Sequence, residues 1–456
     1  MQRSVLLLAI FFIAFIEGAS PAVFAKSPSR RSLAAKDRRI RVVVANQAGA
    51  VWVRRADGTV QKFPSADNDV ARGAALAGAF ALGTELRNST VFLGPGTYVI
   101  PAALRGWNGT KLWGSGKDAT LIKLADGALG SSYFTFRTVE SEDPLTGYRY
   151  CNNCELRDLT IDANRQNQLP GSFFGVGAAM IGSHSTMSNV RCRNAGGNTP
   201  QEVFCLSCGG GGGVGGTFNT GMVKNLLIEN CEVDGVAPGF ASIPIAITAI
   251  ALNGGSAPSA TVPGDGWAVN GRITGCSVHG VTAPSGLIGF QISWASRCIV
   301  ENCSVYGNTG RYIAGFYSDT GSLQNLSVSH NQFSQVDAGA RILCDSDSYH
   351  TGTLIFANDV LTQTVVNGAG KAGIEYSGSH HTSGVRVLGN RIRLEAPVAG
   401  SICVGFADLN AAFILGNTID NFGLAVGLHD AGDTVVRGNT DSNGVAMGAG
   451  AGRQVP

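Results

Sequence analysis

Carboxylate and aromatic side chains gather where short apolar strands end in the second half of the chain. The acidic members of this set are Asp319, Asp345, Asp347, Asp408 and Asp430. Aromatic and imidazole side chains stand close to them, namely Trp294, Tyr317, Tyr349, Tyr376, His350, His380, His381 and His429. Carboxylates act as acids or bases, and aromatic faces offer flat apolar platforms. This mixture of side chains suits a surface that binds sugars.

A repeated segment predicts how these strands are arranged in space. An alternating strand that runs into Asn and a further apolar residue recurs, and the Asn residues are Asn302, Asn331, Asn358, Asn390, Asn417 and Asn439. Their intervals are 29, 27, 32, 27 and 22 residues. A period of this length is typical of a β-solenoid, in which stacked coils bury one continuous apolar column. We expect the Asn side chains to form a ladder at a tight bend, and Cys231, Cys276 and Cys303 to form a buried stack beside it.

The polar strand ends should stack in the same way. Each lies about 8 to 13 residues before its Asn, so successive coils would bring them together on one flank. Asp and Ser are common in exposed turns, and for any single Asp that is the simpler explanation. For the column as a whole we favour a functional surface.

Three kinds of activity are consistent with this column. Hydrolysis would pair Asp319 with Asp345 or Asp347 across a scissile bond. β-Elimination or epimerisation of a uronic acid needs a base and a cation, for which Arg341, His350, Tyr376 and Lys371 are candidates, with Asp319, Asp345 and Asp347 as Ca²⁺ ligands. The third is glycan binding without catalysis. In each case we expect substrate contacts from Trp294, Tyr317, Tyr349, His380, His381, Asp408, His429 and Asp430.

The start of the repeats has its own signals. Asp69 and Gly83 are expected to bound a short helix over Val70–Leu82. A hairpin is predicted at Val51–Arg55 and Thr59–Phe63. The segments FLGPGTYVI, from Phe92, and LWGSGKDATLIKL, from Leu112, follow the helix.

Together the helix and these two segments resemble the N-terminal signature of the pectate-lyase-like superfamily, over residues 67–125. The resemblance implies an all-β fold, a right-handed single-stranded parallel β-helix over residues 63–445 with a short N-terminal capping helix, and a polysaccharide as partner. Residues 446–456 would be a flexible tail. The family's catalytic motifs are missing: Gly-His-Gly, a mid-solenoid Asn-Thr-Asp, Asp-Pro-His and the pectate-lyase arginines are absent, and Asn439-Thr440-Asp441 is interpreted as a turn. No catalytic set is therefore carried over, and the fold does not decide the function.

The N-terminal residues predict export. Arg3, the apolar run Val5–Ile16 and small residues before Ala25 are typical of a signal peptide over residues 1–25. The run is shorter than the ~20 residues that span a membrane, so a retained anchor is the weaker alternative. We predict a secreted or periplasmic protein.

Charge is distributed unevenly along the chain. Residues 26–62, a basic leader that includes the hairpin, carry ten Lys or Arg against two Asp, a net charge of +8. The total is +2 and Arg3 cancels Glu17, so residues 63–456 sum to about −6. The leader is either a solvated segment or attracted to an anionic surface. Because the protein is predicted to be exported and residues 63–456 are acidic, we do not expect nucleic acid as a partner.

The chain has eleven cysteines. Cys151-x-x-Cys154 and Cys205-x-x-Cys208 have the spacing of zinc pairs, but about fifty residues separate the two pairs, unlike compact zinc modules. Because export permits disulfides, we predict local bridges instead, with an odd thiol left over.

From these observations we predict an exported protein that acts as a lyase or epimerase on an acidic, uronic-acid-containing polysaccharide, with Ca²⁺ as its one candidate cofactor. The alternatives are a glycoside hydrolase with paired Asp residues and a non-catalytic glycan-binding or surface protein.

Overall fold

The computed structural model describes residues 40–446 with gaps. Not described within that range are residues 42, 45, 65–67, 129–133, 144–146, 169–175, 196–202, 210–221, 236–246, 255–266, 284–285, 319–320, 345–348, 364–371, 378–381, 408–409 and 430–432. The chain divides into two compact units, Met1–Val43 and Val44–Pro456. The fold described below is that of the second unit. The predicted signal peptide and the predicted tail after residue 446 lie outside the described residues.

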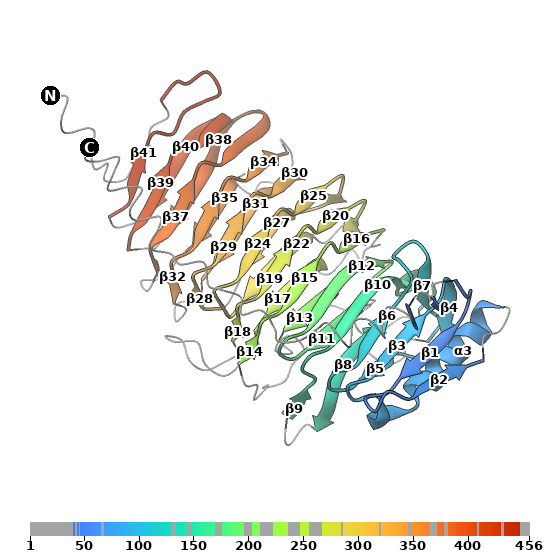
Figure 1. Cartoon of the computed structure of the whole chain (residues 1–456). Helices are drawn as coiled ribbons and strands as arrows, with labels where there is room; N and C mark the ends of the chain where they lie inside the picture. The colour runs from blue at the N-terminus through green and yellow to red at the C-terminus, as the bar shows by residue number, and fades with distance from the viewer. Residues whose placement is uncertain are drawn as a thin grey trace. The chain divides into compact units, whose positions relative to one another are not determined.

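The second unit is a parallel β-solenoid, as predicted (Figure 1). Each coil contributes strands to three long sheets, and each strand pairs in parallel with its counterpart in the next coil. Neighbouring strands lie ~4.8 Å apart, so side chains at equivalent positions stack on one another.

Sheet 1 carries the strands that precede the polar ends. Its strands are β5 (Leu104–Gly106), β8 (Phe134–Asp143), β11 (Val176–Ile181), β13 (Val203–Gly209), β17 (Ile247–Asn253), β22 (Leu287–Ser293), β27 (Ile313–Ser318), β31 (Ala338–Leu343), β35 (Ala372–Ser377) and the later parts of β38 (Arg391–Ala407) and β40 (Thr418–His429). The Gly-, Pro- and Ser-rich composition of residues 204–221 and 237–268 predicts long loops. That is wrong for β13 and β17, which take their place in this sheet.

Sheet 2 forms the side of the solenoid before the tight bend. It contains β3 (Thr90–Leu93), β6 (Lys111–Trp113), the first halves of β10 (Glu155–Asp162) and β12 (Thr186–Arg193), then β15 (Leu227–Glu229), β19 (Arg272–Thr274), β24 (Ile299–Glu301), β29 (Ser327–Ser329), β33 (Leu354–Phe356), β37 (Val385–Leu388), β39 (Ala412–Leu415) and β41 (Val435–Arg437). One inward position in these strands is filled by Ile228, Ile273, Val300, Val328, Ile355, Val387 and Ile414, each at most 1% exposed. Burying each of them contributes about 1.5–3 kcal/mol, and this column holds the coils in register.

Sheet 3 follows the bend. It contains β4 (Gly96–Ile100), β7 (Thr120–Leu124), the second halves of β10 and β12, then β16 (Glu232–Asp234), β20 (Ser277–His279), β25 (Ser304–Tyr306), β30 (Gln332–Val336), β34 (Asp359–Thr362) and the first parts of β38 and β40. A smaller parallel sheet, β14 (Val223–Lys224), β18 (Ala268–Val269), β23 (Ala295–Ser296), β28 (Leu323–Gln324), β32 (His350–Thr351) and β36 (Thr382–Ser383), lies between sheets 1 and 2 along the chain.

The predicted ladder at the bend between sheets 2 and 3 is confirmed, with one correction. The backbone and side-chain nitrogens of Asn331 both donate to Oδ1 of Asn358, at 3.0 Å. Asn358, Asn390 and Asn417 repeat this pattern toward Asn439. Asn302, however, is not a rung. It is exposed with φ of 53°, and the next residue, Cys303, donates its N–H to Asn331 at 2.9 Å.

Cysteines continue this ladder toward the N-terminus. Cys231, Cys276 and Cys303 are at most 2% exposed, which confirms the predicted stack. The predicted disulfides are not found, since none of the eleven cysteines is disulfide-bonded in the structure. For Cys205 and Cys208 the reason is geometric: both lie in β13, three residues and ~10 Å apart, beyond the Cα separation of ~7 Å that a disulfide allows.

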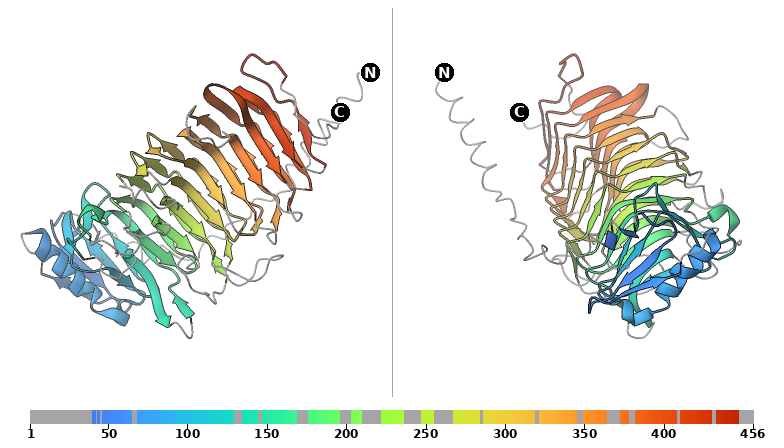
Figure 2. Two further views of the ribbon diagram at one scale, coloured as in Figure 1. Left: turned by 180° about the vertical axis from the view of Figure 1, so that it is seen from behind. Right: turned by 45° about the vertical axis from the view of Figure 1, so that its right-hand side comes forward.

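Helix α3 (Asp69–Phe80) and the hairpin lie at the N-terminal end of the stack (Figure 2). The cap is Asn68, not the expected Asp69, because Oδ1 of Asn68 accepts the N–H of Ala71 at 2.8 Å. Leu76 is buried, and Phe80 packs edge-on against Phe136 of β8 at 6.1 Å between ring centroids. The helix therefore covers the apolar interior at this end.

The hairpin strands β1 (Val51–Arg54) and β2 (Val60–Phe63) form as predicted. Gly58 has a φ of 87° in the turn between them. β1 also pairs antiparallel with β3 of the first coil, so the hairpin covers the first strand of sheet 2.

Candidate functional site

The ends of the sheet 1 strands stack as the sequence predicted. Leu343 of β31, Ser377 of β35, Ala407 of β38 and His429 of β40 are paired in successive coils. The predicted acidic residues follow these ends in the chain, but Asp319, Asp345, Asp347, Asp408 and Asp430 lie outside the described residues, as do His380 and His381.

An outward row on sheet 1 contains two of the predicted site residues, Tyr317 and Arg341. Gln291, Tyr317, Arg341 and Glu375 occupy the same position in successive coils. Nε of Arg341 lies 2.9 Å from Oε2 of Glu375, and the side chains are 31% and 36% exposed. The Arg341 guanidinium also lies over the ring of Tyr312, 5.3 Å from its centroid. We refer to Tyr312, Tyr317, Arg341 and Glu375 as the Arg341 cluster.

The charge state of this cluster is set by burial and by mutual contact. Burial raises the pKa of Tyr312 to about 12, although the Arg341 charge acts against it, so the phenol is neutral at physiological pH. Burial lowers the pKa of Arg341, but Tyr312 and Glu375 more than offset this, so the guanidinium is permanently charged. The guanidinium of Arg341 is the charged neighbour of the Tyr312 hydroxyl, and this contact acts to lower the pKa of the phenol while burial raises it. A neutral phenol beside a fixed guanidinium provides hydrogen-bond donors that suit an anionic ligand.

Two predicted aromatic residues lie at the turn that follows sheet 1. Trp294 and Tyr349 directly precede β23 and β32, so they occupy one position two coils apart, with Ser322 between them. The backbone N–H of Tyr349 donates to Oγ of Ser322 at 3.0 Å. Trp294 packs edge-on against the buried Trp267 at 6.4 Å. Trp294 and Tyr349 are half-buried. His429, at the end of β40, is exposed.

His350 and Tyr376 were predicted to be catalytic, but the structure places them in the core. They are 0% and 1% exposed, and the Tyr376 hydroxyl lies 2.8 Å from Nδ1 of His350. The reason is the alternation of the strand: Glu375 points outward, so its neighbour Tyr376 points inward. Because neither side chain reaches the surface, the prediction that they act on substrate is wrong.

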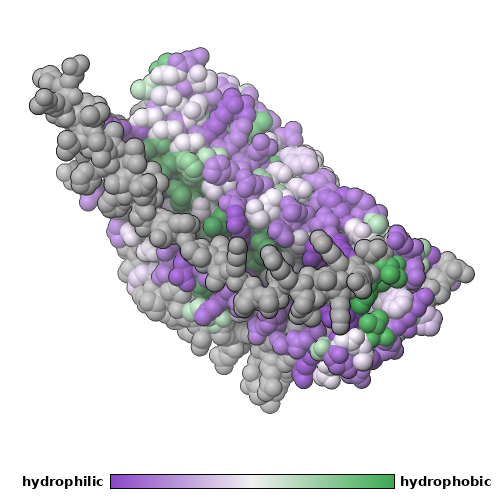
Figure 3. All heavy atoms as spheres, viewed as in Figure 1, coloured by the Kyte–Doolittle hydropathy of each residue, from purple (hydrophilic) through white to green (hydrophobic). Residues whose placement is uncertain are grey.

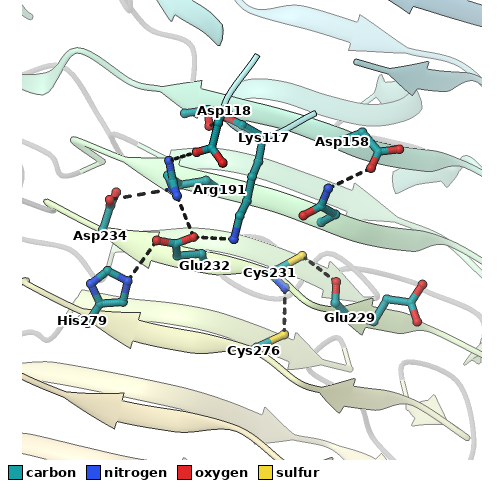
Figure 4. A network of polar contacts seen from close by, with 12 residues as sticks. Lys117, Asp118, Asp158, Arg191, Glu229, Cys231, Glu232, Asp234, Cys276 and His279 are labelled. Carbon is teal, nitrogen blue, oxygen red and sulfur yellow. Dashed lines mark hydrogen bonds and ion pairs between the residues drawn. The ribbon is translucent and has the colours of Figure 1, made fainter. Parts of the chain in front are cut away.

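A second polar group, which the sequence reasoning missed, lies on sheet 3 and in the turn before β7 (Figure 4). Oε2 of Glu232 accepts from Nζ of Lys117 at 2.7 Å and from Nη2 of Arg191 at 3.0 Å. Its Oε1 lies 3.0 Å from Nε2 of His279. Arg191 also reaches Asp118 at 2.7 Å. We refer to these residues and Asp234 as the Glu232 network.

The pKa values of the two carboxylates in this network, Glu232 and Asp234, are shifted in opposite directions. Burial opposes ionisation of Glu232, but the hydrogen bonds from Lys117 and Arg191 prevail and lower its pKa to about 2. Burial raises the pKa of Asp234, and the Glu232 charge adds to this while Arg191 opposes it. Glu232 is therefore an anchor that fastens the Lys117–Asp118 turn to sheet 3, and not a proton donor.

The aligned repeats contain a signal for part of this network. Lys123, Asp162, Arg193, Asp234 and His279 occupy one outward position in successive coils. Their charges alternate, and opposite charges side by side stabilise strand pairing. The segments Cys231-Glu-Val-Asp234, Cys276-Ser-Val-His279 and Cys303-Ser-Val-Tyr306 show that these positions are equivalent.

No group of three His, Cys, Asp or Glu that could hold a metal ion occurs among the described residues. The predicted Ca²⁺ ligands Asp319, Asp345 and Asp347 are not among them, so calcium stays a prediction.

The molecular surface seen in Figure 3 is largely hydrophilic, and hydrophobic areas on it are small and separate. In the part of the chain that the structure describes, no helix is long and apolar enough to cross a membrane.

The chain belongs to the family described as "Rhamnogalacturonase A/epimerase, pectate lyase-like", whose sequence model matches residues 65–313, more than half of the chain. This confirms the predicted resemblance to the pectate-lyase-like superfamily and indicates a carbohydrate-acting β-helix protein. Curated protein sequences gave no match.

Solved structures share the right-handed β-helix fold. The DFA-IIIase of Arthrobacter chlorophenolicus A6, without its lid, is 12% identical with a TM-score of 0.54, and the match covers 85% of this chain and 95% of that one. The surface protein and adhesin PfbA of Streptococcus pneumoniae is 13% identical with a TM-score of 0.50, covering 81% and 93%. The mannuronan C-5 epimerase AlgE4 A-module of Azotobacter vinelandii is 19% identical with a TM-score of 0.46, covering 84% and 95%. At these identities the likeness concerns the fold alone.

Proposed function

We propose that the protein is an exported lyase or epimerase of a uronic-acid-containing polysaccharide, with its active site on the outer face of sheet 1. One observation carries the proposal: Arg341 is a half-buried cation, held by Glu375 at 2.9 Å, and it lies over the ring of the neutral Tyr312, 5.3 Å from its centroid. Membership of a family that includes epimerases supports it. Export rests on the predicted signal peptide at residues 1–25.

The chemistry of a uronic acid matches this arrangement. A base removes the proton on C5, next to the carboxylate, and negative charge develops on the carboxylate oxygens. A guanidinium donates two parallel hydrogen bonds to such a group and stabilises the charge. We assign this role to Arg341.

The fate of the carbanion separates the two reactions. In a lyase, the electron pair forms the C4=C5 double bond, the C4–O bond breaks and the leaving oxygen takes a proton. In an epimerase, C5 takes a proton on the opposite face. Tyr312 is neutral, because burial raises its pKa to about 12, so it is the proposed proton donor in either case. We propose the base among Asp319, Asp345 and Asp347, with Ca²⁺ binding by these carboxylates as a further proposal.

The proposal is tested on the full-length protein with alginate, pectate and neutral glycans, with and without Ca²⁺. Absorbance of unsaturated sugars reports a lyase, and exchange of the C5 proton with deuterated solvent reports an epimerase. We expect one of these signals on an acidic polymer, and a loss of at least tenfold in Arg341→Gln. Arg386→Gln, an exposed arginine of β37 on sheet 2, is the matched control and should retain activity. New reducing ends without absorbance of unsaturated sugars would instead establish a hydrolase. No signal in any of these assays would favour a binding protein.

A further inference from the structure

A row of side chains on the outer face of sheet 3 lies on a different sheet from the Arg341 cluster. One residue of each of five successive coils contributes to it: Tyr306, Ser334, Leu361, Arg393 and Asp420. At ~4.8 Å per coil the row is about 19 Å long, the reach of a short oligosaccharide.

Tyr306 forms an aromatic platform at one end of this row. Tyr306 is 45% exposed, and its ring stacks on His279 at 5.1 Å between centroids with 20° between the planes. His279 is in turn held by Glu232 at 3.0 Å. The next residue of the row, Ser334, is small, so space remains on the far face of the Tyr306 ring. An exposed aromatic ring in a fixed orientation binds a sugar with little loss of side-chain entropy.

A cavity of about 380 Å³ lies at the other end. It is lined by Arg393, Asp420, Asn421, Asp441 and Ser442, among others. This volume is within the range of small-molecule sites.

The two carboxylates of the cavity are held in place by backbone groups. The backbone N–H of Ser442 donates to Oδ1 of Asp420 at 2.8 Å, and that of Asn443 donates to Oδ1 of Asp441 at 2.9 Å. Both hydrogen bonds use Oδ1, so Oδ2 of each carboxylate is placed to accept a hydroxyl. Arg393 lies 3.3 Å from Asp359, which compensates much of its charge.

Charge indicates which kind of sugar this cavity suits. The charged residues that line the cavity are Arg393, Asp420 and Asp441, so its lining carries a net charge of −1. Asp359, outside the lining, has a second arginine, Arg391, opposite it on β38. An acidic sugar would be repelled, whereas the hydroxyls of an uncharged sugar can donate to the carboxylates and accept from Arg393 and Asn421.

We propose that this row is a second carbohydrate-binding site, separate from the site on sheet 1, that binds an uncharged stretch of glycan along the solenoid axis. One sugar ring stacks on Tyr306, and a later ring enters the cavity at Asp420 and Asp441. The site holds polymer on the protein without taking part in its chemistry.

The test is calorimetric titration of the full-length protein with uncharged tetrasaccharides (cello-, manno-, xylo- and galactotetraose) and with tetragalacturonate. We expect at least one uncharged probe to bind, and Tyr306→Ala and Asp420→Asn each to weaken it about tenfold, or ~1.4 kcal/mol. Tyr306→Phe should bind like the original protein. Phe413→Ala, which removes an aromatic ring of 40% exposure from sheet 2, is the matched control and should change nothing.

Three results would overturn the proposal. The first is that no uncharged probe binds. The second is that Tyr306→Ala and Phe413→Ala bind alike. The third is that Tyr306→Ala abolishes turnover of short substrates, which would make the row part of the active site. Because the titration measures binding, it is independent of whether the sheet 1 site is catalytic.

Discussion

The hydroxyl of Tyr376 lies 2.8 Å from Nδ1 of His350 inside the solenoid. Nε2 of the same imidazole lies 2.6 Å from the carbonyl oxygen of Gly321. A carbonyl only accepts, so the proton is on Nε2, and Nδ1 accepts from Tyr376. Sγ of Cys344 also lies 3.0 Å from Nδ1. The contacts with Tyr376 and Gly321 thus fix one neutral tautomer of the buried His350.

This arrangement predicts a stability that depends on pH. Burial lowers the pKa of His350 to about 4, from 6.5, although the Gly321 contact acts against it. Between about pH 4 and 6.5, His350 is therefore protonated in the unfolded chain but neutral in the folded protein. Stability is therefore complete above pH 6.5 and falls as the pH drops toward 4, by on the order of 3 kcal/mol.

Urea unfolding midpoints at pH 7.5, 6.0, 5.0 and 4.5 measure this dependence. His350→Gln should be less stable at pH 7.5 but should lose less on acidification. Equal slopes in the two proteins would show that His350 is not the titrating group.

The Glu232 network predicts a second, more acidic dependence. The pKa of Glu232 is lowered to about 2 from 4.5, so its contribution is complete above pH 4.5 and disappears as the pH falls toward 2. Glu232→Gln leaves Lys117 and Arg191 without their charged partner and should cost about 2 kcal/mol at pH 7. The difference from the original protein should shrink below pH 4.5.

Glu85→Gln is the control for this change. Glu85 also pairs with an arginine, at 3.1 Å from Arg55, but its side chain is 58% exposed, so its loss should cost less than about 1 kcal/mol. If both variants unfold at the same denaturant concentration, the network does not anchor the Lys117 turn.

The sequence predicted the solenoid because a strand that ends in Asn recurs at intervals of 22 to 32 residues, the length of one coil. It misplaced Asn302 because Asn serves two roles here, as a residue that tolerates positive φ and as a rung of the amide ladder. These roles fall on adjacent positions, and a single sequence does not distinguish them. His350 and Tyr376 were assigned to the wrong side for a related reason, since one residue of register moves a side chain to the other face.

The Glu232 network was harder to predict. Glu232 is 115 residues from Lys117, and the turn that carries Lys117 reaches it across two intervening coils. No local pattern encodes that contact. By contrast, Arg341 was among the residues that the sequence predicted, and it lies in the outward row of sheet 1 with Tyr317 and Glu375.

The Asn ladder predicts that one rung is worth several hydrogen bonds. Oδ1 of Asn390 accepts from the backbone and side-chain nitrogens of Asn358, and its Nδ2 donates to the carbonyl of Ile355 at 3.0 Å. Asn390→Ala leaves these buried groups without partners and should cost on the order of 3 kcal/mol in unfolding free energy. Asn443→Ala, at an exposed position, should stay within about 0.5 kcal/mol. Equal denaturation midpoints for the two variants would mean that water replaces the rung.

The last prediction concerns Tyr312 as proton donor. Its pKa is raised to about 12 because the phenol is buried, so it should remain protonated, and able to donate, across the assay range. The rate on the acidic polymer that the protein turns over should show no decline from this group up to pH 10. Tyr312→Phe removes the proton but keeps the ring under Arg341, so we expect kcat to fall at least tenfold while KM changes less than threefold. A Tyr312→Phe protein with unchanged kcat would assign the proton transfer to another group, and a rise in KM alone would make Tyr312 a binding residue.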